Sequence, residues 1–289
     1  MPPAAHLLTI DLEDWYHANL MDGKVDRARA ESRVEASTRR LLDLLEEAGA
    51  RATVFVLGAV AERHPQLVRT VRERGHEIAS HGYAHRLAYQ QSPAEFEEDL
   101  GRSVECIEAA SGVRPAGYRA PSWSITRRNL WALEIVRRAG FAYDSSIFPF
   151  RTFLYGIPGA PNRPFRIRLS QGELLEIPAS TLTLGGVALP FSGGAYFRLL
   201  PAPLARAGFR SVARGGHPAM FYTHPWELDA DCPRVKGLGA AAWLMHYAGA
   251  GRMPGKIRRL LGQFRFLPLA EYLAQVGRGE LPEVRSAEL

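Results

Sequence analysis

The sequence contains very little cysteine, with Cys106 and Cys232 alone among 289 residues. They lie far apart and neither belongs to a C-x-x-C pair, so the sequence predicts neither a disulfide framework nor a cysteine zinc site. It also lacks any run of eighteen or more apolar residues, because its most apolar late stretch, 240–250, is short and contains His246. We therefore expect two inert thiols and no membrane-spanning helix.

No secretion signal is expected either, since residues 1–11 reach an acidic cluster before an apolar region can form. This favours the cytoplasm, or the inner face of the membrane. The sequence has no nucleic-acid-binding motif, so no nucleic acid partner is expected. A net charge of +6 is compatible with contact to an anionic glycan or to a lipid surface, although a solvated surface is its commoner cause.

The composition, 46% hydrophobic and 23% charged, is that of a globular protein. Residues 1–150 predict alternating strands and helices, with strands at 6–11, 52–57, 75–80, 117–121 and 141–144. Between them we expect helices at 32–48, from 58 to about 74, at 92–110 and at 126–138. Residues 151–289 add long Gly- and Pro-rich loops, strands at 174–178 and 219–224 and a helical extension. The alternation predicts one α/β domain with a parallel sheet.

Polar residues recur at the ends of the predicted strands. Asp11, His81, Arg119 and Asp144 each fall at the carboxyl end of such a strand, and His224 ends a later one. The carboxyl ends of parallel strands lie at one rim, where barrel enzymes carry their active sites. This pattern predicts a functional site at that rim.

Two histidines near one of these strand ends suggest a metal site. His81 and His85 are four residues apart, so their imidazoles would share a face if the chain made one helical turn there. The cluster that ends the first strand adds Asp11, Glu13 and Asp14. Two strand ends therefore present two nitrogens and a carboxylate to a single cation.

Several motifs follow one another in a fixed order. They are Thr9-Ile10-Asp11, Ala52-Thr53-Val54-Phe55, the segment from Gly75 to His81-x-x-x-His85, and Arg119-x-Pro121. Over residues 6 to 150 this order resembles the polysaccharide deacetylases of carbohydrate esterase family four, the NodB homology domain. Later come Ser192-Gly193-Gly194-x-Tyr196-Phe197-Arg198 and the segment from Tyr222 to Asp229. They are similar to the bacterial branch associated with exopolysaccharide loci and PEP-CTERM protein sorting.

The resemblance implies a distorted (β/α) barrel with fewer than eight strands, a divalent metal that is usually zinc, and hydrolysis of N-acetyl groups on amino sugars. It implies that Asp11 is the catalytic base and that His81 and His85 bind the metal. Arg119 would hold the base in place, and His224 would act as general acid. The expected substrate is an N-acetylated amino sugar of a bacterial exopolysaccharide or of its lipid-linked precursor.

The sequence departs from the family at three places. The metal carboxylate is either Glu13, which shares the face of Asp11 in an extended strand, or Asp14, which the reach of aspartate and the habit of the family favour. Ser122 replaces an aromatic residue, although its backbone N–H remains a candidate oxyanion donor. Asp144 matches the fourth family motif only loosely.

Two tryptophans, Trp123 and Trp226, are candidates for the walls of a sugar-binding groove, and each is as readily explained by core packing. Five other histidines are assigned to structural or solvent positions: His17, His64, His76, His217 and His246.

Two other functions remain open. One is a hydrolase of small amides on the same barrel, and the other is a glycan-binding protein without catalysis. A ferrous oxygenase also uses two histidines and a carboxylate. It is disfavoured because it leaves Asp11, Arg119 and His224 without a role.

Overall fold

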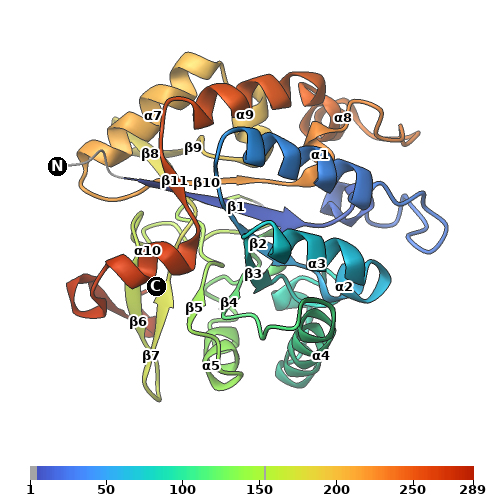
Figure 1. Cartoon of the computed structure of the whole chain (residues 1–289). Helices are drawn as coiled ribbons and strands as arrows, with labels where there is room; N and C mark the ends of the chain where they lie inside the picture. The colour runs from blue at the N-terminus through green and yellow to red at the C-terminus, as the bar shows by residue number, and fades with distance from the viewer. Residues whose placement is uncertain (1–4, 153) are drawn as a thin grey trace.

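The first strand, β1 (His6–Leu12), is buried along its whole length and lies in the middle of the molecule (Figure 1). It pairs in parallel with β10 on one side and β2 on the other. Successive side chains of a strand point to opposite faces. Leu8 and Ile10 accordingly pack into the largest apolar core, whereas Leu7 faces a second core inside the curved sheet. Asp11 shares the inner face with Leu7, and the alternation therefore places its carboxylate at the rim.

The structure, a computed structural model, describes residues 5–152 and 154–289. Part of the segment in which no secretion signal is expected, residues 1–4, lies outside this range. The strand order is β10-β1-β2-β3-β4-β5-β7-β6-β12, with β11 paired to the start of β1. The further strands are β2 (Thr53–Val56), β3 (Glu77–Ser80), β4 (Gly117–Tyr118), β5 (Tyr143–Asp144), β6 (Phe165–Arg168), β7 (Glu173–Glu176), β10 (Met220–Thr223), β11 (Phe266–Leu267) and β12 (Glu283–Arg285). A separate hairpin consists of β8 (Thr181–Leu184) and β9 (Val187–Pro190).

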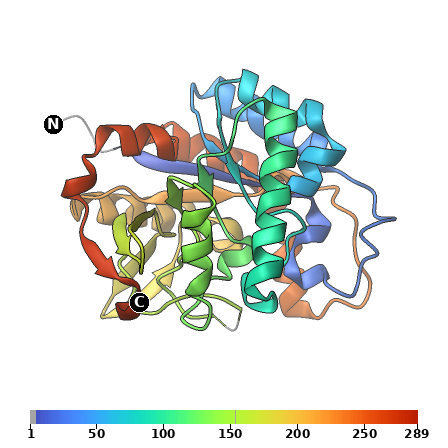
Figure 2. The ribbon, with the colours of Figure 1, turned by 90° about the horizontal axis from the view of Figure 1, so that it is seen from below.

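Helices surround the curved sheet. They are α1 (Val34–Glu47), α2 (Gly58–Arg63), α3 (Pro65–Glu73), α4 (Pro93–Ser111), α5 (Trp131–Arg138), α6 (Gly194–Leu199), α7 (Ala202–Arg214), α8 (Ala240–Tyr247), α9 (Met253–Leu261) and α10 (Leu269–Gln275). Figure 1 shows α1, α7 and α9 above β1 and α4 and α5 below it, and in Figure 2, seen from below, α4 and α5 lie in front. Within the described ranges, none of the helices has both the length and the apolar character that a bilayer span requires.

The parallel part of the sheet curves around the inner core. Strands β10, β1, β2, β3, β4, β5 and β7 run parallel, and only β6 pairs antiparallel with β7. Among the described residues no strand pair joins β7 to β10. Instead, Met220 N donates to Ser180 Oγ (2.8 Å) and Tyr222 N donates to the Ser192 carbonyl (3.2 Å). The fold is therefore the expected α/β class with a mostly parallel sheet, and loop contacts cross the open edge.

Local signals explain where the helices begin and end. Ser92 and Glu95 form the reciprocal cap expected at the start of α4. The helix expected up to residue 74 is divided at His64, because Pro65 opens a new helix there. The helix expected from residue 126 starts only at Trp131. Asn129 Oδ1 instead accepts a hydrogen bond from Thr126 N (2.8 Å), which closes a turn before the helix.

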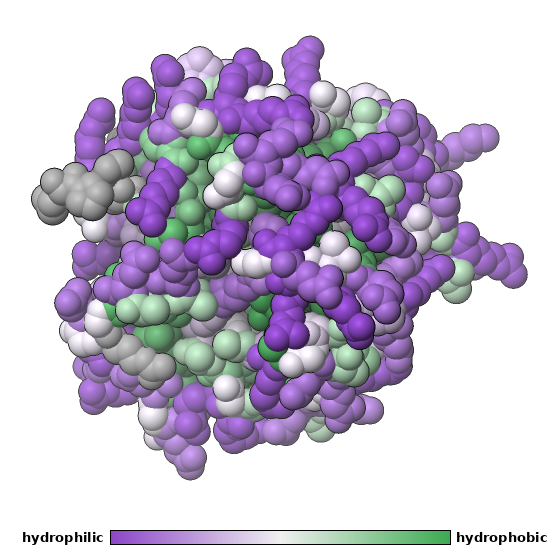
Figure 3. All heavy atoms as spheres, in the orientation of Figure 1, coloured by the Kyte–Doolittle hydropathy of each residue, from purple (hydrophilic) through white to green (hydrophobic). Residues whose placement is uncertain are grey.

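Hydrophilic side chains cover most of the face shown in Figure 3. The exposed large apolar side chains concentrate in the β8–β9 hairpin and on α8, where Leu184, Val187, Trp243 and Leu244 are the most exposed examples. Both cysteines are free thiols, as expected.

Candidate active site

Asp11 forms a buried ion pair with Arg119. Arg119 NH1 donates to Asp11 Oδ1 at 2.6 Å, and the two side chains are 0% and 2% exposed. The remaining donors of the guanidinium are also engaged, because they contact the Thr9 hydroxyl, the Ser145 carbonyl and hydroxyl, and Met220 Sδ. A buried charge is tolerated when it is paired and hydrogen-bonded in this way. Arg119 thus fixes one oxygen of Asp11 and leaves Oδ2 directed to the rim.

Glu13, His81 and His85 converge next to this pair. Each offers one ligand atom, these atoms lie within 4.8 Å of one another, and all three residues are buried. Burial lowers the pKa of His81 to about 4, so its ring is neutral at neutral pH. His81 Nδ1 lies 2.8 Å from the Arg119 carbonyl, which can only accept, so Nδ1 carries the proton and Nε2 keeps its lone pair. This is the tautomer that a metal ligand requires.

A tight turn, and not the helical turn considered from the sequence, brings the histidines together. Residues 81–87 contain no helix. Gly82 has φ 74° and His85 has φ 56°, a conformation that is uncommon for a residue other than glycine. Asp99 on α4 fixes the turn by accepting hydrogen bonds from Tyr83 N (2.8 Å) and Ala84 N (3.3 Å). A strained backbone held by its surroundings is typical of functional sites.

The residues present fit a divalent cation. Glu13 Oε2 approaches His85 Nε2 to 2.8 Å, yet it has no hydrogen-bond donor among the described residues although it is buried. Burial raises the pKa of Glu13, but the adjacent histidines outweigh that effect and hold it below its usual range, so the group is a carboxylate. Trp226 Nε1 donates to Glu13 Oε1 at 3.1 Å and fixes its orientation. An unsatisfied buried carboxylate oxygen facing two imidazoles is the donor set that zinc uses.

Asp14, the other candidate carboxylate, is directed elsewhere. Its oxygens accept hydrogen bonds from Trp15 N, the Ser32 hydroxyl and Arg33 N. Asp14 thereby caps the short helix that follows β1 and holds the segment that leads into α1. Of the two carboxylates that the sequence left open, the structure brings only Glu13 to the histidines.

His224 lies at the end of β10 and faces Asp11. Its Nε2 lies 3.8 Å from Asp11 Oδ2, and its Nδ1 lies 3.0 Å from Glu227 Oε2. Glu227 in turn accepts from Arg198 NH1 at 3.0 Å in a fully buried pair. Burial alone lowers the pKa of His224, but the hydrogen bond and charge of Glu227 outweigh burial and raise it to about 9. In the absence of a cation, His224 is therefore protonated at neutral pH.

A cavity of about 450 Å³ opens onto these groups. Asp11, Glu13, His81, His85 and His224 line one end of it, and its walls are mostly apolar and aromatic. The expected groove residues Ser122, Trp123 and Trp226 line it too, together with Tyr155, Tyr196 and Tyr222. A cavity with apolar walls and a few convergent polar groups is the usual form of a ligand site.

Ser122 and Trp123 adopt left-handed backbone conformations, with φ 51° and 47°. Two such residues in succession store strain, which is common where a backbone group is aimed at a ligand. Among the described residues, no acceptor takes up the Ser122 N–H, and its hydroxyl donates to Asn19 Oδ1. This amide is thus available at the cavity.

Asp144 does not belong to this cavity, contrary to its assignment from the sequence. It accepts hydrogen bonds from Ser146 N (3.1 Å) and Oγ (2.6 Å), and Ser146 Oγ accepts from Ala120 N (2.8 Å). Asp144 therefore supports the loop that carries Ser122. Burial raises the pKa of Asp144, and burial together with the charge of Asp144 holds the pKa of Glu176 well above its usual range. Glu176 is the protonated partner of this carboxyl pair.

Known families match both halves of the chain. A model of the polysaccharide deacetylase family matches residues 22–143, and a model of a domain of unknown function, DUF3473, matches residues 145–274. Residues 22–143 are therefore similar to the polysaccharide deacetylase family. Asp11 and Glu13 precede the first matched range and His224 lies in the second. The site therefore combines residues from outside the matched deacetylase range with His81, His85 and Arg119 inside it.

The curated relatives are similar over a limited segment. The chain is 34% identical over 118 residues to the peptidoglycan deacetylase-like protein FGM2 of Gibberella zeae, which covers 40% of this chain and 34% of that protein. It is 32% identical over 113 residues to the peptidoglycan deacetylase of Helicobacter pylori, which covers 39% of this chain and 38% of the relative. The matched segments thus span little more than a third of these relatives.

One solved structure resembles the whole chain. A protein from Mycobacterium smegmatis, provisionally named a polysaccharide deacetylase, superimposes with a TM-score of 0.67 at 22% identity and covers 98% of this chain and 95% of that one. At this identity the likeness establishes the fold alone.

Sequence reasoning missed the residues that support His224. Glu227 stands three positions after His224, a spacing that a helical turn brings together, and this signal was readable. Arg198 gave no such signal, because its contact with Glu227 joins α6 to the segment after β10. His246, assigned to a structural position, stacks on Trp226 with ring centroids 4.4 Å apart and lines the cavity.

The first prediction concerns the metal carboxylate. Glu13→Gln removes a charged ligand and should weaken zinc binding by more than about 100-fold, since even outer partners of ligands are worth about 10–100-fold. Asp14→Asn should change the affinity by less than about tenfold, because Asp14 caps a helix. Calorimetric titration of the metal-free variants measures both. A larger loss in Asp14→Asn than in Glu13→Gln would contradict the assignment.

The second prediction concerns the carboxyl pair. Glu176 is protonated in the folded protein but ionises above about pH 4.5 when unfolded. Protonated Glu176 therefore contributes its full share to the free energy of unfolding below about pH 4.5. This share is lost as the pH rises toward the raised pKa of Glu176 in the folded protein. Glu176→Gln cannot ionise and should raise the thermal midpoint by about 2–4 °C at pH 8, as expected for ~1 kcal/mol. At pH 4 it should have little effect.

Thermal unfolding across that pH range tests this prediction. Glu173→Gln on the same strand is the control, since its side chain is 37% exposed and should show no such pH dependence. An equal gain for Glu176→Gln at both pH values would rule out the proposed protonation.

Proposed function

We propose that the protein is a metal-dependent N-deacetylase that removes acetyl groups from N-acetylated amino sugars of a bacterial exopolysaccharide or its lipid-linked precursor. We place the reaction in the cytoplasm or at the inner face of the membrane. One observation carries the chemical part of the proposal. A carboxylate fixed by a buried arginine, Asp11, lies beside the Glu13, His81 and His85 cluster and faces His224 across 3.8 Å.

Glu13, His81 and His85 would hold the divalent ion, for which zinc is the expected element. When bound, such an ion polarises the acetyl carbonyl and lowers the pKa of a coordinated water to about 7. All other requirements of amide hydrolysis fall to side chains and backbone groups of the protein.

Asp11 is suited to accept the proton of the attacking water. Arg119 occupies Oδ1 at 2.6 Å, and Oδ2 stays directed to the cavity. An oxygen that is held in place and has a free lone pair is what a general base needs. Because Arg119 uses its other donors on Ser145, Thr9 and Met220, the orientation of the carboxylate is fixed before substrate binds.

His224 is placed to donate a proton to the departing sugar nitrogen. Its Nδ1 is held by Glu227, which leaves Nε2 directed toward Asp11 and the cavity. In catalytic triads, too, a carboxylate orients a histidine and stabilises its positive charge. The Ser122 N–H, which also lines the cavity, would help to stabilise the oxyanion.

The cavity supports a sugar substrate. Trp123, Tyr155, Tyr196 and Trp226 offer aromatic surfaces beside the catalytic groups. Apolar ring faces combined with a few polar groups suit a pyranose, which has apolar faces and hydroxylated edges. The deacetylase family and the curated relatives support a glycan in preference to a small amide.

The third prediction tests the proposed activity. Zinc-loaded protein should release acetate from N-acetylglucosamine oligomers. Asp11→Asn should retain zinc and lose about 10²–10⁴-fold in rate, which is the usual value of a general base. His81→Ala should lose zinc and activity together. Acetate release and bound zinc are measured on the same samples.

The outcomes separate the alternatives. Glycan binding without acetate release at saturating zinc would identify a silent binding protein. Cleavage of small amides without action on oligomers would identify the other hydrolase. Equal loss of zinc in both variants would mean that Asp11 is a ligand and not the base.

The fourth prediction isolates the proton donor. An amine leaving group must be protonated, whereas the phenolate of an activated acetate ester leaves without a proton. His224→Ala should therefore slow amide hydrolysis by about 10²–10⁴-fold and ester hydrolysis by less than about tenfold. The rate of each reaction is measured with zinc saturating. Similar losses on both substrates would exclude the general acid role.

A further inference from the structure

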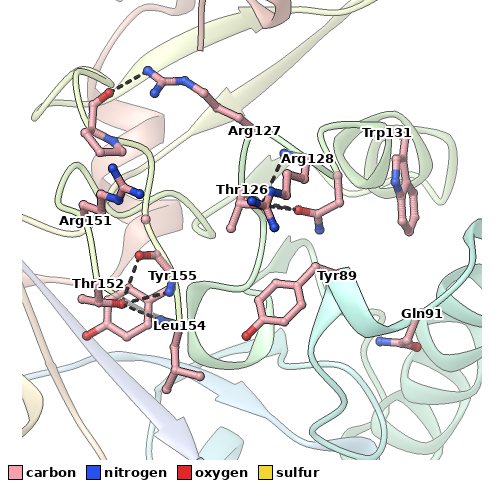
Figure 4. Close-up of a pocket in the computed structure, with 13 residues that line it drawn as sticks. Tyr89, Gln91, Thr126, Arg127, Arg128, Trp131, Arg151, Thr152, Leu154 and Tyr155 are labelled. Atoms are coloured by element: carbon pink, nitrogen blue, oxygen red, sulfur yellow. Dashed lines mark hydrogen bonds between the residues drawn. The ribbon is translucent and has the colours of Figure 1, made fainter.

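Figure 4 shows a second pocket, of about 630 Å³, which shares lining residues with the active-site cavity. Thr152, Leu154 and Tyr155 line both, so one segment of chain forms the wall between them. A ligand longer than one sugar unit in the active site would extend over this wall. The second pocket is therefore placed to contact a neighbouring unit of the same glycan.

Three arginines and no acidic residue line this pocket. Arg127 is engaged, because its guanidinium donates to the carbonyls of Pro158 (2.7 Å) and Leu289. Arg128 and Arg151 are exposed, and among the described residues no carboxylate or carbonyl accepts from either side chain. They come from different segments, one just before α5 and one after β5, and Figure 4 shows them on either side of the pocket. Two unpaired cations from separate segments that line one pocket offer it a preference for an anion.

The other lining residues suit a sugar. Tyr89 and Trp131 are half-buried aromatic side chains in the pocket wall, and Gln91 lines the pocket with an amide side chain. Aromatic faces pack against pyranose rings, and an amide can hydrogen-bond a sugar hydroxyl.

We propose that this pocket binds a sugar unit that carries an anionic group, a carboxylate or a phosphate, next to the N-acetylated unit in the active site. Arg128 and Arg151 bind the anionic group, and Tyr89, Trp131 and Gln91 contact the sugar ring. The inference rests on the proposed function and narrows its substrate to an acidic glycan. The net charge of +6 also favours an acidic glycan, because it attracts negatively charged polymers.

Binding measurements test this pocket separately from catalysis. Zinc-loaded protein is titrated with hyaluronan oligosaccharides, which alternate N-acetylglucosamine with a uronic acid, with neutral N-acetylglucosamine oligomers of equal length, and with N-acetylglucosamine 1-phosphate. The test variant is Arg128→Gln/Arg151→Gln. The control is Arg69→Gln/Arg210→Gln, which removes the same charge from exposed positions outside the pocket.

The wild-type protein should bind the uronate oligomer at least about tenfold more tightly than the neutral one, and this preference should decrease with salt. The test variant should lose the preference, whereas the control should keep it. Tighter binding of N-acetylglucosamine 1-phosphate than of the neutral oligomer, lost in the test variant, would also support the pocket. It would identify phosphate as the anionic group. Equal binding of acidic and neutral probes by the wild type, or equal losses in both variants, would overturn the proposal.

The two proposals fail differently. Arginine-dependent binding without acetate release from any probe would retain the anionic subsite and remove the deacetylase. Acetate release from neutral oligomers, with no arginine-dependent preference for anions, would retain the deacetylase and remove the anionic subsite.

Discussion

The buried ion pair between Arg119 and Asp11 is the interaction on which the site depends. A guanidinium that is 0% exposed is stable only with its donors satisfied, and here they connect β1, the end of β4, the end of β5 and β10. The same residue fixes His81, because its carbonyl accepts the Nδ1 proton. The side chain and the backbone carbonyl of Arg119 therefore position both the proposed base, Asp11, and a proposed metal ligand, His81. Loss of Arg119 would leave Asp11 buried and unpaired.

The groups of the proposed active site come from both halves of the chain. The first half supplies Asp11 and the Glu13, His81 and His85 cluster, while the second supplies His224 and its supports, Glu227 and Arg198. Strand pairing joins the halves, since β1 lies between β2 and β10. The segment that matches a domain of unknown function therefore supplies part of the proposed active site, together with the segment that matches the polysaccharide deacetylase model.

Much of the site was readable from the sequence because strand ends converge. Period-two alternation placed Asp11 and Glu13 on one face, and the structure brings Glu13 to the histidines. The position of Asp14 was not readable, because its partners Ser32 and Arg33 lie in a loop without a regular pattern. The same applies to Arg198 and to the β8–β9 hairpin, which lie in the stretch where Gly and Pro obscure local signals. Asp144 was misassigned because a strand end does not reveal whether its side chain reaches the cavity or a buried partner.

The central claim is that one cation is held by Glu13, His81 and His85 while Asp11 stays free. A crystal structure of the zinc-loaded protein, with anomalous diffraction recorded at the zinc edge, tests it most directly. The account predicts one strong anomalous peak in contact with those three side chains, with Asp11 bound to Arg119. A peak coordinated by Asp11 or Asp14, or no peak at this position at saturating zinc, would contradict it.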